Sequence, residues 1–321
     1  MEFLSMSEPN LSDRSVLVTG GAGFVGGQLV QTLAPDNEVT VIDDLSTGDR
    51  DRVPDDVTFV HGDVRDQRKL KQEIEAADVV FHEAAVVGVP ASLRDPPRSN
   101  HVNTGATVQL LDYARQYDTR VVLASSAAIY GEPESVPIEE DHPLEPTSPY
   151  GVDKLAVDHY ARVFAQQYDL PVVPLRYFNI YGPRTGPNPY SAVADVFLEQ
   201  ARSGEPITVH GTGEQTRDFV HVDDVVQANL RAATTDEVGV AYNVGTGSSI
   251  SIAELAELIR AATDSDSPIT HADERSGDIS DSEADISRAR ERLGYEPTVD
   301  LRSGIDRLVD VATPADPPSS S

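Results

Sequence analysis

The chain has 321 residues, of which 39% are apolar and none is cysteine, and 25 basic against 54 acidic residues give a formal charge of −29. This length allows one large domain or two packed lobes, and the lack of cysteine excludes disulfides and thiolate chemistry. No apolar run approaches the ~20 residues that span a membrane, and no basic-then-apolar leader is seen. The negative charge would repel nucleic acid and anionic membranes. We therefore expect a cytoplasmic protein that binds neither.

Short β-branched runs alternate with amphipathic stretches in the first half of the chain, which is typical of βαβ units and a parallel sheet. The predicted strands are Ser15–Thr19, Val39–Asp43, Val57–His61, Val79–His82, Val121–Ser125 and Val172–Tyr177. The predicted helices are Gly23–Leu33, Gln67–Glu75, Asn100–Gln116 and Pro149–Gln167. Together they predict an α/β fold whose doubly wound parallel (Rossmann) sheet occupies residues 1–178 and binds a dinucleotide.

The composition changes after residue 178, and glycine and proline become dense from Gly182 to Pro189. Shorter helices are predicted at Ala192–Ser203, Ile252–Ala262, Ile286–Leu293 and Leu301–Val311. We assign residues 179–312 to a smaller mixed α/β lobe that binds the substrate, allowing the chain to cross back to the first lobe. Residues 313–321, rich in proline and serine, are predicted to be a disordered tail.

The first predicted strand runs directly into Thr19-Gly20-Gly21-Ala22-Gly23-Phe24-Val25-Gly26 and a predicted helix. Glycines at 20, 23 and 26 allow a tight turn and a close approach of backbone N–H groups to a pyrophosphate. Asp43 ends the second strand, where a carboxylate accepts hydrogen bonds from the adenosine ribose and repels a 2′-phosphate. The pattern predicts NAD rather than NADP. Asp63, after the third strand, is placed to meet the adenine ring, or else caps a turn.

Tyr150 and Lys154 lie four residues apart on a predicted helix and therefore share one face. A tyrosine with a pKa near ~10 is a poor base at neutral pH, but a nearby ammonium and a cationic nicotinamide favour its phenolate. The chain has only three lysines, Lys69, Lys71 and Lys154, so a lysine kept here favours a compact ammonium beneath a cofactor over a surface charge. Ser126 follows the fifth strand, where an open α/β sheet binds ligands, and can hydrogen-bond the hydroxyl that is oxidised.

The motifs, taken in order, resemble those of the extended short-chain dehydrogenase/reductase family, in its branch of nucleotide-sugar epimerases and dehydratases. The resemblance runs from Val16 to about Leu308 and rests on Thr19–Gly26, Asp43–Leu45, His82–Ala85, Ser125–Gly131, Tyr150 with Lys154, Leu175–Gly182, Gly211–Asp224 and Arg275–Asp285. It implies NAD in the first lobe and a nucleoside-diphosphate sugar in the second. The implied cofactor contacts are Gly20, Gly23, Phe24, Val25, Gly26, Asp43, Asp44, Asp63, Val64, Ala84, Ala85, Asn103, Ser125, Tyr150, Lys154 and Tyr177.

The residues after Ser126 narrow the reaction that the resemblance implies. Family dehydratases carry an Asp-Glu pair directly after this hydroxyl, and decarboxylases a glutamate two residues after it, whereas this chain has Ala127 and Ala128. Alanine cannot transfer protons, so the resemblance favours 4-epimerisation of a UDP-hexose through a 4-keto sugar. A UDP-glucuronate 4-epimerase, a 3,5-epimerising relative, a nucleotide-sugar reductase and a non-catalytic NAD sensor are the alternatives.

The resemblance also implies substrate contacts in the second lobe. Arg217 and Arg275 match two family arginines that hold the diphosphate, as guanidinium geometry allows. Asp278 matches a ribose ligand, and Asn179 and Tyr177 match residues beside the sugar and the nicotinamide. Ser282 replaces a bulky tyrosine of the narrow glucose/galactose enzymes, which would admit N-acetylated hexosamines, and the segment from Val87 to Ser92 points to the same branch.

The resemblance further implies a homodimer in which the helices at 100–116 and 149–167 pair into a four-helix bundle. The eight histidines show no metal-ligand spacing, so no metal is expected; His82, His101 and His221 are read as structural.

The acidic residues are spread along the whole chain, which indicates a solvated acidic surface. Self-repulsion of such a surface is screened within about 3 Å at 1 M salt, so we predict a host with a very salty cytoplasm. An ordinary acidic bacterial enzyme is the alternative.

We therefore expect the folded protein to melt at a higher temperature in molar KCl than in low salt. Thermal unfolding followed in about 0.1 M and about 1 M KCl measures the difference in screening. Equal melting temperatures would overturn the halophile hypothesis.

Overall fold

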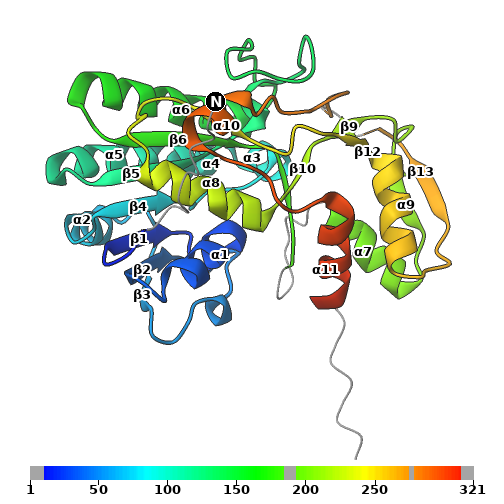
Figure 1. Ribbon diagram of the computed structural model, residues 1–321, viewed down its shortest axis with the longest axis horizontal. Coiled ribbons are helices and arrows are strands. Elements are labelled where there is room, and N and C mark those ends of the chain that lie inside the picture. Colours follow the sequence, from blue (N-terminus) through cyan, green and yellow to red (C-terminus); the bar gives the residue numbers. More distant parts are fainter. Residues whose placement is uncertain (1–10, 184–192, 275–277, 312–321) are drawn as a thin grey trace, which may run out of the picture.

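The computed structural model describes residues 11–183, 193–274 and 278–311 of the chain (Figure 1). The predicted tail at 313–321 and Arg275 lie outside the described residues. The largest feature of the fold is a seven-stranded sheet with the strand order β11-β6-β5-β4-β1-β2-β3, in which every neighbouring pair is parallel. The strands are β1 Ser15–Thr19, β2 Glu38–Asp43, β3 Thr58–His61, β4 Val79–His82, β5 Arg120–Ser126, β6 Val172–Tyr177 and β11 Tyr242–Val244. The predicted α/β fold with a doubly wound parallel sheet is confirmed.

Helices cover both faces of this sheet, because alternate residues of its strands are apolar and buried on opposite sides. The helices of the large lobe are α1 Phe24–Leu33, α2 Gln67–Glu75, α5 Ala106–Tyr117, α6 Pro149–Tyr168, α8 Val222–Thr234 and α10 Ser287–Leu293. Val16 and Val18 of β1 belong to the core under α1 and α8, whereas Leu17 belongs to the core under α2, α5 and α6.

A smaller lobe with its own core lies to one side of the sheet (Figure 1, right). Its helices are α7 Val193–Ser203, α9 Ile252–Ala262 and α11 Leu301–Val311, and its two-stranded sheets pair β7 Asn179–Tyr181 with β10 Phe219–His221, β9 Thr216–Arg217 with β12 Ile250–Ser251, and β8 Ile207–His210 with β13 Ile269–Ala272. The chain crosses back between these parts, since α8 and β11 return to the large lobe. The predicted lobe boundary at residue 178 stays a prediction.

The structure differs from the predicted elements around residue 100. Instead of one helix over 100–116, the chain forms α3 Val89–Arg94, α4 Pro96–Asn100, a π-helical turn at His101–Gly105 and then α5. Prolines at the first turn of α3 and α4 explain why helices form at positions that a sequence pattern treats as breaks, because the first turn does not need the missing N–H. The helix α8 was not predicted.

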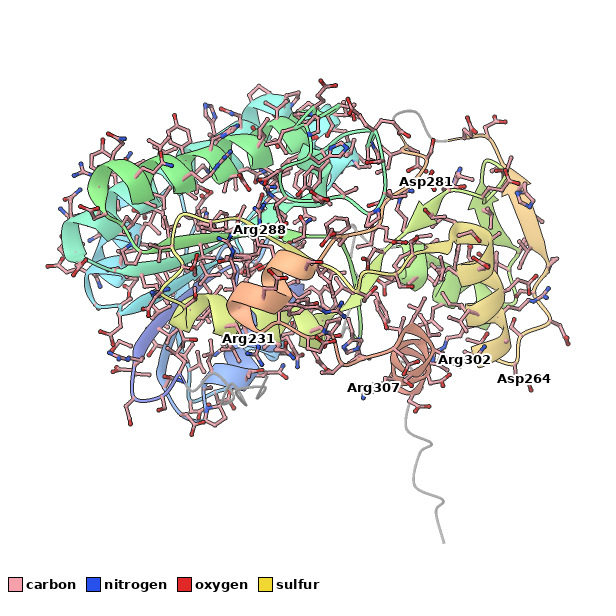
Figure 2. All side chains as sticks on the ribbon, turned by 45° about the horizontal axis from the view of Figure 1, so that its top comes forward. Arg231, Asp264, Asp281, Arg288, Arg302 and Arg307 are labelled. Atoms are coloured by element: carbon pink, nitrogen blue, oxygen red, sulfur yellow. The ribbon has the colours of Figure 1, made fainter. Side chains whose placement is uncertain are left out.

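A buried ion pair fixes α6 against the sheet. Asp158 of α6, fully buried, accepts hydrogen bonds from Nε and Nη2 of Arg176 on β6 at 2.8 and 3.0 Å. Nη1 of Arg176 also donates to the Tyr130 hydroxyl and to the carbonyl of Glu140. The Glu140 carboxylate in turn lies 3.4 Å from Arg288 of α10. Figure 2 labels Arg288 on this helix. Since every buried charge in this group has a partner, α6 has one defined position on β5 and β6.

Charged side chains cover the surface of both lobes (Figure 2). Asp264, for example, is exposed at the outer end of the smaller lobe. In the described part of the chain, no helix is both long and apolar enough to cross a membrane.

The turn between β1 and α1 allows almost no side chains. Gly20 has a φ of +70°, in the region that favours glycine, and its carbonyl accepts a hydrogen bond from Gly23 N at 2.9 Å. A Cβ on Gly26 would lie 2.2 Å from the Gly20 carbonyl oxygen. No side chain caps the amino end of α1. The helix therefore begins close to the end of β1, and its N-terminal N–H groups point towards the carboxyl edge of the sheet.

We expect Gly26→Ala to weaken NAD binding by at least about tenfold, or about 1.4 kcal/mol, because the turn must open to accept the methyl group. Gly27→Ala is the matched control, since a Cβ there would meet Arg52 Cβ at a tolerable 3.4 Å and alanine favours helix by up to ~1 kcal/mol. Calorimetric titration with NAD, on variants first shown to melt cooperatively, measures both. Unchanged affinity in Gly26→Ala would refute the role of the turn.

Candidate active site

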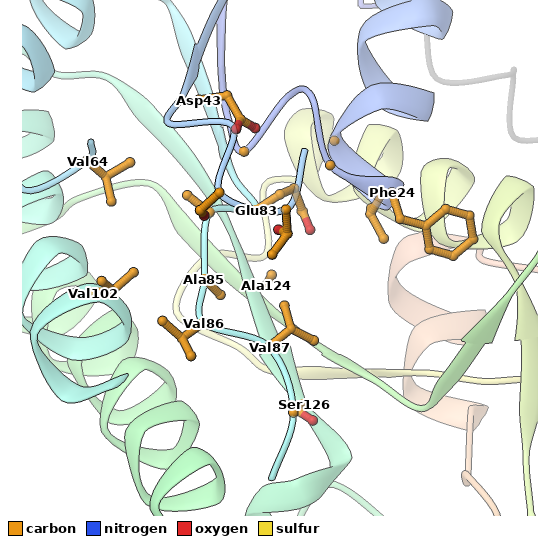
Figure 3. A pocket seen from close by; sticks show the side chains of 18 of the residues that line it. Phe24, Asp43, Val64, Glu83, Ala85, Val86, Val87, Val102, Ala124 and Ser126 are labelled. Atoms are coloured by element: carbon orange, nitrogen blue, oxygen red, sulfur yellow. The ribbon is translucent and has the colours of Figure 1, made fainter. Parts of the chain in front are cut away.

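A cavity of about 470 Å³ lies at the carboxyl edge of the parallel sheet, where an open α/β sheet binds its ligands (Figure 3). Residues that follow β1, β2, β3 and β4 line it on one side, and residues from β5, α6 and the end of β6 line it on the other. The predicted site residues that it brings together are Gly20, Gly23, Phe24, Val25, Gly26, Asp43, Asp44, Asp63, Val64, Ala84, Ala85, Ser125, Ser126, Tyr150, Lys154, Tyr177 and Asn179.

Asp43 joins the glycine turn to the end of β2. Its carboxylate accepts hydrogen bonds from Ala22 N at 3.0 Å and Leu45 N at 2.8 Å. Burial raises the pKa of Asp43, and these two bonds act against that shift because they stabilise the carboxylate. Asp63 lies further out and pairs with Arg65 at 2.5 Å, which lowers its pKa. Both carboxylates lie where the adenosine half of a dinucleotide was predicted.

The start of α6 places Tyr150 in the cavity. Ser148 caps this helix by accepting a hydrogen bond from Gly151 N, and Tyr150 N donates to the buried Ser92 hydroxyl at 3.1 Å. Burial raises the pKa of Tyr150 to about 12, while a hydrogen bond from Ser126 acts in the opposite direction. The hydroxyl of Ser126 also accepts from Ala128 N at 3.2 Å. The protein alone therefore keeps Tyr150 protonated at neutral pH, and a bound cation is needed to make it a base.

Lys154 lies one helical turn further along the same face of α6. Its ammonium donates to the carbonyl of Ala124 at 2.6 Å and lies 5.9 Å from the centre of the Tyr150 ring. The side chain is buried, and burial lowers its pKa because an ammonium loses hydration there. The predicted pairing of Lys154 with Tyr150 on one helix face is thus present in the structure.

Glu83 lines the cavity, and no role was predicted for it. It follows β4 directly, and its Oε1 accepts a hydrogen bond from the Tyr177 hydroxyl at 2.9 Å. The Tyr177 hydroxyl in turn accepts from Nδ2 of Asn229 on α8 at 2.8 Å. Glu83 stands within the quoted run from His82 to Ala85, but no pattern rule assigns a carboxylate at that position a task. Arg98, Phe178 and Ile180 also line the cavity and were not predicted.

His82 is a buried structural residue below the cavity floor. Its ring nitrogens hydrogen-bond the hydroxyls of Thr19 and Thr107 at 2.7 and 2.9 Å. Burial and the nearby Lys154 lower its pKa to about 3, so the imidazole is neutral at physiological pH.

Some predicted residues lie outside the cavity lining. Asn103, on the π-helical turn, is buried and hydrogen-bonds the backbone N–H and carbonyl of Val86, which itself lines the cavity. Asn103 therefore fixes the position of Val86 in the cavity wall and does not itself line the cavity. Three predicted substrate residues gather in the smaller lobe: Arg217 Nη2 donates to Asp278 Oδ1 at 2.5 Å, and Ser282 N donates to the Thr216 carbonyl at 3.1 Å. Arg275 lies outside the described residues.

The cavity fits NAD in shape and in chemistry. Because Gly26 has no Cβ, α1 packs closely on the turn at Gly20, and no side chain caps its amino end, where backbone N–H groups can bind a pyrophosphate. A carboxylate ends β2, and the walls between carry small or branched apolar residues such as Ala85, Val86 and Ala124 (Figure 3). These features match the two halves of a dinucleotide that lies along the carboxyl edge.

Comparison with known proteins agrees with this site. The NAD dependent epimerase/dehydratase family matches residues 16–245. The chain is 38% identical over 305 residues to the UDP-glucose 4-epimerase of Mycolicibacterium smegmatis, covering 92% of this chain and 97% of that protein.

Solved structures extend the comparison. The UDP-N-acetylglucosamine 4-epimerase of Methanobrevibacter ruminantium, in complex with UDP-N-acetylmuramic acid, has a TM-score of 0.90 and 35% identity, over 94% of this chain and 98% of that one. The UDP-glucose 4-epimerase of Thermus thermophilus, in complex with NAD, has a TM-score of 0.86 and 37% identity, over 92% and 98%. The family resemblance found in the motifs is confirmed. The chain belongs to the NAD-dependent epimerase/dehydratase family, an enzyme family whose cofactor is NAD.

Proposed function

We propose that this enzyme inverts C4 of a UDP-hexose. The observation that carries the proposal is the grouping of Ser126, Tyr150 and Lys154 on one cavity, with only methyl side chains at the two positions after Ser126. Such a site can move one proton and support oxidation at one carbon, and at the two positions after Ser126 it has no acid–base pair of the kind that an elimination needs. The relatives named as 4-epimerases support this choice.

Each residue of this group has a distinct task in the proposed reaction. NAD supplies reversible two-electron oxidation of the sugar carbon. Tyr150 removes the proton from the C4 hydroxyl and later returns it. Ser126 would hold that hydroxyl by turning its own O–H from Tyr150 to the ligand, while its oxygen accepts from Ala128 N. Lys154, held by the Ala124 carbonyl, favours the phenolate form of Tyr150. The 4-keto sugar turns over before reduction, which inverts the centre.

The smaller lobe supplies the nucleotide contacts in this proposal. Arg217 donates hydrogen bonds within the protein, to Asp278 and to the carbonyls of Thr216 and Ile279. A ribose that hydrogen-bonds Asp278 would compete for that carboxylate and leave Arg217 free for the diphosphate. Arg275 would complete the diphosphate site.

The sugar is proposed to include N-acetylated hexosamines. Ser282 lies beside Arg217 through its backbone bond to Thr216, and its small side chain stands where the narrower enzymes carry a bulky tyrosine. The relative from M. ruminantium, named for UDP-N-acetylglucosamine, supports this assignment.

We expect the purified enzyme, in molar KCl, to convert both UDP-glucose and UDP-N-acetylglucosamine to their 4-epimers, with UDP-glucuronate as a third substrate to be compared. Proton NMR of the anomeric signals follows each conversion. Tyr150→Phe should lower turnover by about 10² to 10⁴-fold, because the acid–base group is lost, while NAD stays bound.

Three outcomes would contradict parts of the proposal. Stoichiometric consumption of reduced cofactor would identify a reductase, and cofactor binding without any turnover would identify a sensor. Conversion of UDP-glucose alone would refute the inference from Ser282.

The proposed homodimer rests on an exposed apolar stripe of α6. Val152, Tyr160 and Val163 are 52%, 38% and 46% exposed, and their spacing puts them on one face of the helix. A second copy of α6 with α5 beside it would cover this stripe in a four-helix bundle.

We expect Val163→Glu to convert the dimer to monomer in light-scattering chromatography, because the variant places a charge in an apolar interface. Val136→Glu is the matched control, since Val136 is 43% exposed but lies outside α6. A wild-type monomer, or a Val163→Glu dimer as tight as the wild type, would refute the four-helix interface.

A further inference from the structure

Glu83 is a carboxyl group inside the cavity that the proposed reaction does not use. Its backbone N–H donates to the Thr19 carbonyl at 3.1 Å, which fixes the residue at the end of β4. The side chain points into the space between the Asp43 and Ala124 walls (Figure 3). A carboxyl group placed in a largely apolar cavity is costly unless something in the site uses its charge.

A hydrogen-bonded chain holds this carboxyl in one orientation. Nδ2 of Asn229, fully buried, donates both to the Val225 carbonyl and to the Tyr177 hydroxyl, each at 2.8 Å. The Tyr177 hydroxyl has two acceptors within reach, Glu83 Oε1 at 2.9 Å and Asn229 Oδ1 at 3.1 Å, and Glu83 is the nearer. The orientation of Glu83 is therefore set from α8, through β6, by groups on the side of the cavity opposite α6.

Lys154 and Tyr150 line the same cavity as Glu83, from α6. The register of β4 with β5 pairs His82 with Leu123 and so sets Glu83 beside Ala124, whose carbonyl accepts from the Lys154 ammonium at 2.6 Å. Burial raises the pKa of Glu83 and lowers the pKa of Lys154, and the opposite charge of each partner acts against the shift of the other. Burial and, to a smaller extent, the charge of Glu83 raise the pKa of Tyr150. Burial disfavours the charged form of each of the three groups, because a charged group loses hydration there. Each charge of the Glu83–Lys154 pair thus depends on the other.

The other groups around Glu83 supply no comparable charge. His82, its neighbour on β4, is neutral, with a pKa lowered to about 3. Asp153 of α6 also raises the pKa of Lys154. However, its carboxylate is bound by Ser99 at 2.6 Å and Asn100 at 3.0 Å, on the side of α6 that faces α4. The remaining partners of Glu83, Tyr177 and Asn229, are uncharged side chains.

We propose that Glu83 is a positioning residue for catalysis, whose carboxylate is the counter-charge that keeps the Lys154 ammonium protonated beneath Tyr150. The inference rests on the proposed function for its consequence in catalysis, but the charge coupling itself does not. The negative charge of Glu83 has two opposing effects on the site. The carboxylate stabilises the cation that the site needs, and it also opposes the phenolate form of Tyr150. Glu83 therefore sets the pH range in which the ammonium and the phenolate coexist.

The sign of the effect follows from these directions. Without the negative charge, the ammonium of Lys154 and the phenol of Tyr150 both lose their protons at lower pH. The alkaline limb of the pH–rate profile, due to Lys154, and the acid limb, due to Tyr150, should both move to lower pH. The loss of this single charge is expected to move each limb by roughly one pH unit.

The test uses the full chain with NAD bound and lysine labelled with ¹³C at the side chain. Only three lysines occur, so the spectrum holds three titrating signals, and Lys154→Arg assigns the one that matters. In Glu83→Gln, which keeps the oxygen that accepts from Tyr177, the Lys154 signal should titrate roughly one unit lower than in the wild type. Glu83→Asp keeps the charge and should restore most of the shift.

Glu140→Gln is the matched control, because Glu140 is also a buried glutamate that accepts a backbone hydrogen bond, from Asn243 N, but it pairs with Arg288 instead of facing Lys154. It should leave the Lys154 titration unchanged. A Lys154 signal that titrates alike in Glu83→Gln and the wild type would overturn the proposal, as would an equal shift in the control.

The NMR readout separates this inference from the proposed reaction. If Lys154 shifts in Glu83→Gln but no nucleotide sugar is converted by the wild type, the coupling stands and the proposed function fails. If UDP-hexoses are epimerised but the pH–rate profile and the Lys154 signal do not move in Glu83→Gln, the proposed function stands and the role of Glu83 fails.

Discussion

The ion pair between Asp158 and Arg176 decides where the chemistry can take place. It joins the middle of α6 to β6, and one turn earlier the same helix carries Lys154, whose ammonium reaches the Ala124 carbonyl at the end of β5. A buried pair of this kind adds little net stability, because desolvation offsets the attraction. Its contribution is positional. A slip of α6 by one residue would leave Asp158 without its guanidinium and would also take Tyr150 away from Ser126.

Most of the large lobe was predictable from the sequence because its first six strands are β-branched runs that end in polar residues. The six predicted strands agree with the observed ones within a residue or two, whereas the edge strand β11 was not predicted, and the motif residues meet at the carboxyl edge as a parallel sheet requires. In the smaller lobe the helices α7, α9 and α11 were predicted within a residue, but the strands were not, since strands of two residues such as β9 and β12 are too short to show a period. The helix α8 did show one, with Val222, Val225 and Val226 buried on one face, and it was missed.

The candidate site was predictable only where a local motif carries the function. Gly20, Asp43, Tyr150 and Lys154 are found from their neighbours in sequence. Glu83 is different, because its significance comes from Tyr177 and Asn229, which lie 94 and more residues away and meet it only through the fold. In the same way, the contact between Arg217 and Asp278 depends on how two short segments of the smaller lobe come together.

The return of the chain to the large sheet has a consequence for inheritance. The edge strand β11 pairs with β6, and α8 covers the same face as α1, yet both follow the first crossing into the smaller lobe. A gene fragment that ends after β6 would encode a sheet without its last strand and with Val173 and Leu175 stripped of the α8 side chains that bury them. The cofactor lobe is therefore not encoded by one continuous segment that could be transferred alone. Recombination between relatives preserves a complete sheet only if it exchanges both segments together.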